Sequence, residues 1–275
     1  MNGRETAITD DALARPSTHL FLSPHYDDIA LSCGGTARRL RGLGRSPEVA
    51  IVFGSEPDPE NGFTAFATAM HVGWGMDAHE VIASRRAEEA DAAAVLGTEV
   101  SFLPFHDAIY RGERYLNDPE LFGEVRGDEF DLAAAIISAL GLERIEKSST
   151  RIYAPLAIGW HVDHQIVFHA GVALGANGWD VWFYEDLPYA LKPGISAERI
   201  ERVGIDVVIA ALVAVHATWE AKIDAIMAYP SQLETIFRYV DSTSGQTEID
   251  ALLRGYATGA GDGVAVERFW RVNRG

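Results

Sequence analysis

Short apolar runs alternate along the chain with longer segments in which apolar residues recur every three or four positions. The short runs are predicted to be buried strands and the longer segments to be helices. The predicted strands span residues 19–22, 49–53, 100–103, 151–154, 181–184 and 206–209, with a last edge strand at 264–272. The predicted helices span residues 29–43, 81–96, 132–145, 165–174 and 217–227.

Strands that alternate with helices are typical of βαβ units around a parallel sheet. We therefore expect an α/β, Rossmann-like fold of three layers, with a mostly parallel sheet and helices on both faces. Residues 1–16 are polar and are expected to form a mobile N-terminal lead, whereas residues 17–275 are expected to form a single domain.

Two long stretches, residues 54–79 and 105–129, break this alternation and are rich in aromatic residues. Long loops in compact domains are usually functional or disordered, and aromatic residues argue against disorder. We expect both stretches to form the rim of a pocket that binds a sugar, because rings offer stacking faces for pyranoses. The candidate substrate residues are Tyr26, Trp74, Asp107, Tyr110 and Arg111, with Tyr115 as a further stacking face.

The composition narrows the classes of function. The chain has 275 residues and a net charge of −17, which disfavours nucleic-acid binding because that requires Lys and Arg to neutralise phosphates. It has a single cysteine, Cys33, expected to be buried, so no intrachain disulfide can form. A cytoplasmic location is expected, with neither a secretory signal nor a membrane span. The oligomeric state is left open.

Chemistry is concentrated just after two of the predicted strands. His25, Asp27 and Asp28 follow the first strand, and in a parallel sheet ligands bind outside the carboxyl ends of the strands. Imidazole and carboxylate groups are ligands of zinc, which at catalytic sites uses three protein ligands and keeps one position open. His25 and Asp28 can supply two of these ligands. Asp27 can also be read simply as a helix N-cap.

A second cluster, His161, Asp163 and His164, follows the strand at 151–154. His164 can supply the third zinc ligand if the two strands lie close together. Asp27, His161 and Asp163 are then left for catalysis and for support of the ligands.

These motifs resemble the PIG-L/LmbE-like zinc N-deacetylases, whose usual first motif is Ala-His-Pro-Asp-Asp-Glu. Here Tyr26 stands at the proline position and Ile29 at the glutamate position, and neither is a ligand position. Arg85, Glu88 and several later segments extend the resemblance over most of the chain, although Arg85 and Glu88 are also expected to form an ion pair on their helix. The resemblance is strongest to a bacterial branch that deacetylates amino sugars of secondary metabolites, such as glycopeptide-antibiotic precursors.

The expected activity is hydrolysis of the acetyl group from the amine of an N-acetylated amino sugar or glycoside, with one Zn²⁺ (or another divalent metal) per chain. Asp27 is expected to act as the general base, and a protonated His161 to stabilise the oxyanion. Asp163 is expected to orient an imidazole and keep it charged. These roles also match what the resemblance implies.

Two other functions are considered. One is an amidase that acts on thiol-sugar conjugates, since the sequence does not identify the acyl group. The other is a non-catalytic, small-molecule-binding Rossmann-like protein. A nucleotide-binding Rossmann protein would need a glycine-rich first turn, whereas this turn contains histidine and aspartate. The presence of Asp27 argues against loss of catalysis.

Overall fold

The computed structural model describes residues 7–57, 62–76, 78–240 and 245–273. Seven of its strands form one sheet in the order β3-β2-β1-β4-β5-β7-β6. Strands β1 to β5 pair in parallel, and β7 is antiparallel to both of its neighbours. The strands are β1 (Thr18–Ser23), β2 (Glu48–Ile51), β3 (Glu99–Phe102), β4 (Thr150–Pro155), β5 (Asp180–Tyr184), β6 (Val207–Ala214) and β7 (Val266–Val272). The predicted α/β class and mostly parallel sheet are confirmed.

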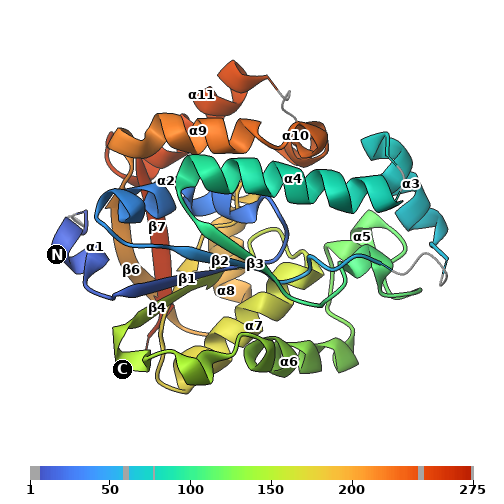
Figure 1. The fold of residues 1–275 in the computed structure, drawn as a ribbon, viewed down its shortest axis with the longest axis horizontal. Helices are drawn as coiled ribbons and strands as arrows, with labels where there is room; N and C mark the ends of the chain where they lie inside the picture. Colours follow the sequence, from blue (N-terminus) through green and yellow to red (C-terminus); the bar gives the residue numbers. More distant parts are fainter. Residues whose placement is uncertain (1–6, 58–61, 77, 241–244, 274–275) are drawn as a thin grey trace.

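Helices cover the sheet on both sides (Figure 1). α2 (Asp28–Gly42), α4 (Ala78–Leu96) and α9 (Trp219–Met227) pack together on one face. α6 (Asp131–Ala139) and α7 (Val162–Ala176) lie on the other. The remaining α-helices are α1 (Asp10–Ala14), α3 (Ala65–Trp74), α5 (Asp118–Leu121), α8 (Ile195–Arg202), α10 (Pro230–Phe237) and α11 (Gln246–Ala260). The short 3₁₀ turns are η2 (Ala108–Tyr110), η3 (Gly127–Phe130), η4 (Leu142–Arg144), η5 (Lys147–Ser149), η6 (Tyr189–Leu191), η7 (His216–Thr218) and η8 (Arg238–Val240). No helix in the described part of the chain has both the length and the apolar character needed to cross a bilayer.

Some elements differ from the prediction. β7 is not an edge strand, because it lies between β5 and β6 and pairs with both. The stretch 54–79, predicted to be irregular, contains α3, which begins after an N-cap at Thr64 and ends at a left-handed Gly75. The helix predicted at 132–145 ends at Ala139, shortly before the left-handed Gly141. Helices α8, α10 and α11 were not predicted.

Part of the segment expected to be a mobile lead is packed against the domain. α1 begins after Thr9, whose hydroxyl accepts a hydrogen bond from the Ala12 amide, and Leu13 lies in the core. The Ile8 amide donates to the carbonyl of Leu212 in β6. Residues 1–6 lie outside the described residues.

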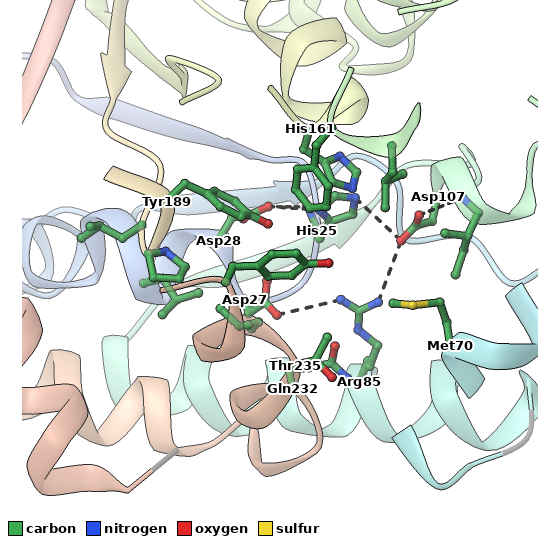
Figure 2. A pocket seen from close by; sticks show the side chains of 18 of the residues that line it. His25, Asp27, Asp28, Met70, Arg85, Asp107, His161, Tyr189, Gln232 and Thr235 are labelled. Carbon is green, nitrogen blue, oxygen red and sulfur yellow. Dashed lines mark hydrogen bonds and ion pairs between the residues drawn. The ribbon is translucent and has the colours of Figure 1, made fainter. Parts of the chain in front are cut away.

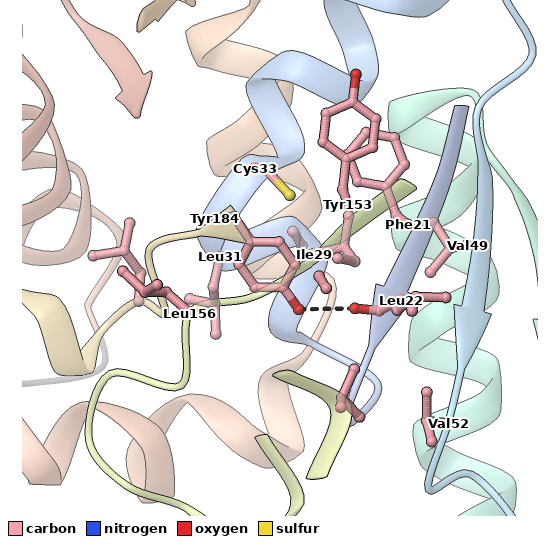
Figure 3. Packing of buried hydrophobic residues seen from close by; sticks show 14 of the residues in the cluster. Phe21, Leu22, Ile29, Leu31, Cys33, Val49, Val52, Tyr153, Leu156 and Tyr184 are labelled. Carbon is pink, nitrogen blue, oxygen red and sulfur yellow. Dashed lines mark hydrogen bonds between the residues drawn. The ribbon is translucent and has the colours of Figure 1, made fainter. Parts of the chain in front are cut away.

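The core fixes where β1 ends and α2 begins (Figure 3). The rings of Phe21 and Tyr153, from β1 and β4, stack with their centroids 4.1 Å apart. The Tyr184 hydroxyl donates to the Leu22 carbonyl across the sheet (2.9 Å). Because these contacts join β1, β4 and β5 in the core, the loops that follow the strands have a fixed base.

Helix α2 is kinked where the sequence contains two glycines. The buried Cys33 has non-helical dihedral angles (φ −143°, ψ 25°), so the amides of Gly35 and Thr36 are free to bond outside the helix. Both donate to the Glu267 carboxylate (3.0 and 2.7 Å), which also pairs with buried Lys222 at 2.6 Å. A Cβ at Gly35 would lie 2.8 Å from Val215, so close packing requires glycine there. The helix that starts at Asp28 is thereby attached to β7.

We predict that His19 makes stability depend on pH. Its ring is fully buried: Nε2–H donates to the Pro16 carbonyl (3.0 Å), and Nδ1 accepts from the Tyr153 hydroxyl (2.9 Å). Burial, helped by the charge of Arg151, lowers the pKa of His19 from 6.5 to about 4. The neutral form is therefore favoured by folding, and this stability, up to about 3 kcal/mol, is lost as the pH falls from 6.5 to about 4.

Urea unfolding of wild type and His19→Gln at pH 7.5, 6.0, 5.0 and 4.0 measures this effect. The free energy of unfolding should fall less steeply in His19→Gln across that window. Equal slopes for the two proteins would show that His19 is not responsible.

Candidate metal centre and active site

The two predicted His/Asp clusters meet at the carboxyl ends of β1 and β4. These strands are parallel neighbours, with Phe21 opposite Tyr153. From β1 the chain continues to β2 and β3 on one side, whereas from β4 it continues to β5 on the other. A change of direction of this kind opens a crevice above the sheet, where ligands bind in α/β proteins. The expected closeness of the two strands is confirmed, and it brings the two His/Asp clusters together.

Each of two histidines is held by a buried carboxylate. His25 Nε2–H donates to Asp163 Oδ2 (3.1 Å), and His164 Nδ1–H donates to Asp186 Oδ1 (2.6 Å). The other ring nitrogens both face Asp28: His25 Nδ1 lies 3.6 Å from Asp28 Oδ2, and His164 Nε2 lies 3.4 Å from Asp28 Oδ1. A carboxylate behind the ring is the usual way in which a metal-binding histidine is oriented.

Two of the separations among His25, Asp28 and His164 suit the ligands of a metal ion. Ligands at about 2.0–2.2 Å from a tetrahedral ion lie roughly 3.3–3.6 Å from each other, and the two measured separations fall in this range. Within the described residues, no lysine or arginine pairs with Asp28. His161 also lies nearby, since one nitrogen from each of the three histidines is within 4.8 Å of the others. The donor set can therefore hold a divalent cation.

Buried charges shift the ionisation of the histidine and aspartates. Burial opposes protonation of His25, but Asp107, Asp163 and Asp28 outweigh it and raise its pKa to about 9. Burial also opposes ionisation of Asp163, but Arg111 and His25 hold the pKa of this carboxyl far below its usual range. The pKa of Asp27 is raised by burial and by neighbouring Asp28. Cationic groups are strongly favoured between these carboxylates.

His161 is in a different environment from the other two histidines. Its Nδ1 accepts a hydrogen bond from the Asp163 amide (3.2 Å), so the proton of the neutral ring is on Nε2. Burial and the charge of His25 lower the pKa of His161 well below 6.5. The Asp163 carboxylate orients His25 and not His161. The ring that Asp163 orients is thus His25.

The loop that carries His161 has an unusual backbone conformation and is held by two side chains. Ala157 and Trp160 both have left-handed dihedral angles, with φ of 62° and 60°, which is unusual for residues other than glycine. The Gln165 side chain donates to the Trp160 carbonyl (2.6 Å), and Asp186 Oδ2 accepts from the Ile158 amide (2.9 Å). Asp186 therefore positions both His164 and the loop segment that leads to His161.

Asp27 is at the N-cap position of α2, but its side chain makes no capping hydrogen bond. It lines the pocket, and its Oδ2 lies 3.9 Å from Arg85 Nη2 (Figure 2). The Asp27 carboxylate therefore does not act as a helix cap. Asp27 is available to a ligand beside the candidate metal ligands.

Comparison with known proteins agrees with this geometry. The family model described as PIG-L, GlcNAc-PI de-N-acetylase, matches residues 20–174. The chain belongs to the PIG-L family. The resemblance seen in the sequence motifs is thereby confirmed, and residues 20–174 contain both His/Asp clusters.

Individual PIG-L relatives are similar over much of the chain. The 2'-N-acetylparomamine deacetylase of Niallia circulans is 31% identical over 62% of this chain and 66% of its own length. The enzyme of the same name from Streptomyces fradiae is 32% identical over 78% of this chain and 73% of its own length. The zinc-inhibited form of teicoplanin deacetylase Orf2 superposes with a TM-score of 0.75 and 22% identity, covering 94% of this chain and 98% of that one.

Arg85 lines the pocket, a position that was not foreseen from the sequence. It does not pair with Glu88, as expected for a helix surface, because it is buried, with Nη1 4.0 Å from Asp107 Oδ2. Its guanidinium lies over the Tyr26 ring (5.0 Å) and makes no hydrogen bond to the described residues. Glu88 instead accepts hydrogen bonds from the amide and hydroxyl of Ser231.

The predicted substrate residues separate into two groups. Trp74 and Asp107 line the pocket, as do other residues of both long stretches. Tyr26, Tyr110 and Arg111 are outside the pocket lining that the described residues form. Tyr26 donates to the Gly54 carbonyl (2.7 Å), Tyr110 bonds to His71 (2.7 Å), and Arg111 lies between Asp163 and Glu129 (2.6 and 2.8 Å). Tyr115 was wrongly expected to be a stacking face, since it is fully buried and donates to Glu129.

We predict that the purified protein binds about one equivalent of divalent metal and that His164→Ala abolishes tight binding. The substitution removes a ligand nitrogen and leaves Asp28 without one of its two histidines. Mass spectrometry of metal content after dialysis measures the effect. His169→Ala, on the same helix but outside the cluster, is the matched control and should retain the metal. Equal metal affinity in His164→Ala and wild type would rule out this ligand set.

Proposed function

We propose that this protein is a zinc-dependent deacetylase that removes the acetyl group from the amine of an N-acetylated amino sugar within a glycoside. The observation that supports this most directly is that two histidines, each held by a carboxylate, both face Asp28. Asp27 lies next to this group, and its side chain makes no capping hydrogen bond. The related paromamine and teicoplanin enzymes are named as deacetylases, and such a substrate agrees with both names.

The proposed zinc ligands are His25, Asp28 and His164. When bound, zinc lowers the pKa of a water molecule towards neutrality and polarises the amide carbonyl. Two histidines and one carboxylate form a set of three ligands that is common in catalytic zinc sites. The teicoplanin deacetylase, which has the same fold, is described in a zinc-inhibited form, so zinc can bind to a protein of this fold.

Asp27 is proposed to move the proton. The attacking water forms a C–O bond to the acetyl carbon, and Asp27 accepts the proton that this water gives up. The C–N bond then breaks, and Asp27 delivers the proton to the leaving amine, so that acetate and a free amine are released. A carboxylate whose pKa is raised by burial is suited to this exchange, because it holds a proton more readily than an exposed carboxylate does.

His161 is proposed to stabilise the developing negative charge as a neutral hydrogen-bond donor. Its Nδ1 is occupied by the Asp163 amide, so Nε2–H is the group that can donate to the acetyl oxygen. This revises the role expected from the sequence, in which the ring was protonated. A neutral donor can stabilise an oxyanion, and the lowered pKa of His161 favours the neutral ring.

Arg85 and Asp107 are proposed to bind the hydroxyl groups of the sugar. Arg85 lines the pocket and its buried Nε has no hydrogen-bond partner, whereas Nη1 lies 4.0 Å from the acceptor Asp107 Oδ2. Buried donors without partners are rare in folded proteins, which favours a ligand as the partner. A donor and an acceptor side by side can bind hydroxyl groups, which both donate and accept hydrogen bonds.

Amine release from a panel of compounds tests the reaction. We expect turnover of N-acetylglucosamine glycosides and no turnover of N-acetylated peptides. An amide that links a thiol amino acid to glucosamine belongs in the panel, because exclusive turnover of this compound would support the alternative amidase. A metal-loaded protein that binds these sugars and releases no amine would support the non-catalytic alternative.

We predict that Asp27→Asn retains the fold and the metal but loses about 10²- to 10⁴-fold in kcat, because the amide cannot accept the proton of the water. Steady-state kinetics on samples of measured metal content give the value. Asp131→Asn, an exposed residue at the start of α6, is the control and should behave as wild type. Turnover by metal-loaded Asp27→Asn within a few-fold of wild type would remove Asp27 from the mechanism.

We predict that Arg85→Gln lowers kcat/KM by roughly 10- to 100-fold, mainly through KM, because hydrogen bonds from a charged group contribute about 1.5–3 kcal/mol. The neighbouring Arg86, which donates to the Gly54 carbonyl (3.2 Å) and lies outside the pocket lining, gives the control variant Arg86→Gln. Equal effects of the two substitutions would mean that Arg85 acts through stability and not through the substrate.

A further inference from the structure

The pocket has two unlike walls on either side of the metal-ligand cluster. One wall is polar and contains Asp27, Arg85 and Asp107. The other is aromatic and contains Phe122, Tyr189 and Tyr239. In Figure 2, Tyr189 lies to one side of His25, and Asp107 and Arg85 lie to the other. A substrate bound at the cluster therefore meets groups of different chemistry in the two directions.

The three aromatic rings come from separate segments and contact one another. Phe122 lies 4.9 Å from Tyr239 and 5.7 Å from Tyr189, and the two tyrosine rings are 6.0 Å apart. Phe122 also meets His161 edge-on at 5.2 Å, and Tyr189 meets His164 at 6.0 Å. All three rings are half-buried, so each keeps surface that a ligand can cover.

Tyr239 is the outermost of these rings. Among the ring contacts of the described residues, it touches Phe122 and Tyr189 but neither histidine, so it lies one ring further from the cluster. The methyl of an acetyl group extends only one carbon beyond the carbonyl that reacts. Tyr189, next to His164, is close enough to cover it, and Tyr239 with the side of Phe122 that it contacts is left for a larger part of the substrate.

We propose that Phe122 and Tyr239 bind the aglycone, the ring to which the amino sugar is attached, and so determine a preference for glycosides over free sugars. The inference rests on the proposed deacetylase function. The hydroxyl groups of the amino sugar have partners on the polar wall, whereas the flat face of a second ring is matched by aromatic side chains, which bind ring faces by stacking. Neither residue was a candidate from the sequence.

The aromatic wall is anchored so that its geometry is set before the substrate binds. Tyr239 follows α10, and the start of α10 is tied to α4 by the two hydrogen bonds from Ser231 to Glu88 (2.9 and 2.6 Å). The Tyr229 hydroxyl adds a bond to Glu89 of the same helix (2.7 Å). Because α4 also carries Arg85, one helix supports both Arg85 and the segment that leads to Tyr239, which lowers the cost of ordering them when the substrate binds.

Kinetics with free N-acetylglucosamine, its methyl glycoside and its phenyl glycoside test this proposal. For wild type, kcat/KM should be highest for the phenyl glycoside. In Tyr239→Leu and Phe122→Leu, the ratio of kcat/KM for the phenyl glycoside to that for the free sugar should fall roughly three- to tenfold, the size of a stacking contact. Tyr239→Phe keeps the ring and should keep the ratio. Phe130→Leu, which removes an exposed ring outside the pocket lining, is the matched control.

N-hexanoylglucosamine is included as a fourth substrate. If the leucine substitutions lower kcat/KM for this compound and not for the phenyl glycoside, the rings bind the acyl chain and the proposal is wrong. Equal wild-type kcat/KM for the free sugar and the phenyl glycoside would overturn this proposal alone. Absence of amine release from all four compounds would overturn the deacetylase function with it.

Discussion

Asp28 lies between two histidines that come from distant parts of the chain, and the rest of the site is arranged around it. His25 reaches it from the end of β1, and His164 reaches it from the first turn of α7. Their approach requires β1 and β4 to be neighbours in a parallel sheet, and it requires Asp163 and Asp186 to turn each ring the right way. Three carboxylates this close are costly to bury without positive charge, and Asp163 pairs with Arg111. A metal ion bound at Asp28, as proposed, would therefore also stabilise the fold.

The part of the site that could be predicted is the part that is local in sequence. The apolar runs before His25 and before His161 identified buried strands, and their carboxyl ends are a general place for ligands in this class of fold. Since parallel neighbours end on the same side, the two clusters could be expected to meet. Asp186 was not foreseen, because nothing near it in the sequence shows that its partner is His164, 22 residues away.

The residues that were missed lie on helices whose packing could not be inferred from one element alone. Arg85 lies one turn after Val81 on α4, and both are buried, so Arg85 belongs to the face of the helix that packs against the core. The charge of Arg85 favoured the prediction of an exposed side chain, since arginine is rarely buried without partners. Phe122 and Tyr239 come from segments that meet only through α10, a helix that the sequence pattern did not reveal. Similarly, alternation predicted the strand β7 but not its neighbours, which depend on long-range pairing.

The position of β7 also has a consequence for the order in which the protein can be assembled. The last strand of the chain is inserted between β5 and β6, and its Glu267 binds the amides exposed by the kink in α2. The helix that begins at Asp28 therefore receives part of its support from a residue synthesised long after it. During translation the N-terminal strands can pair early, but the first cluster cannot reach its final geometry until the C-terminal segment has emerged from the ribosome.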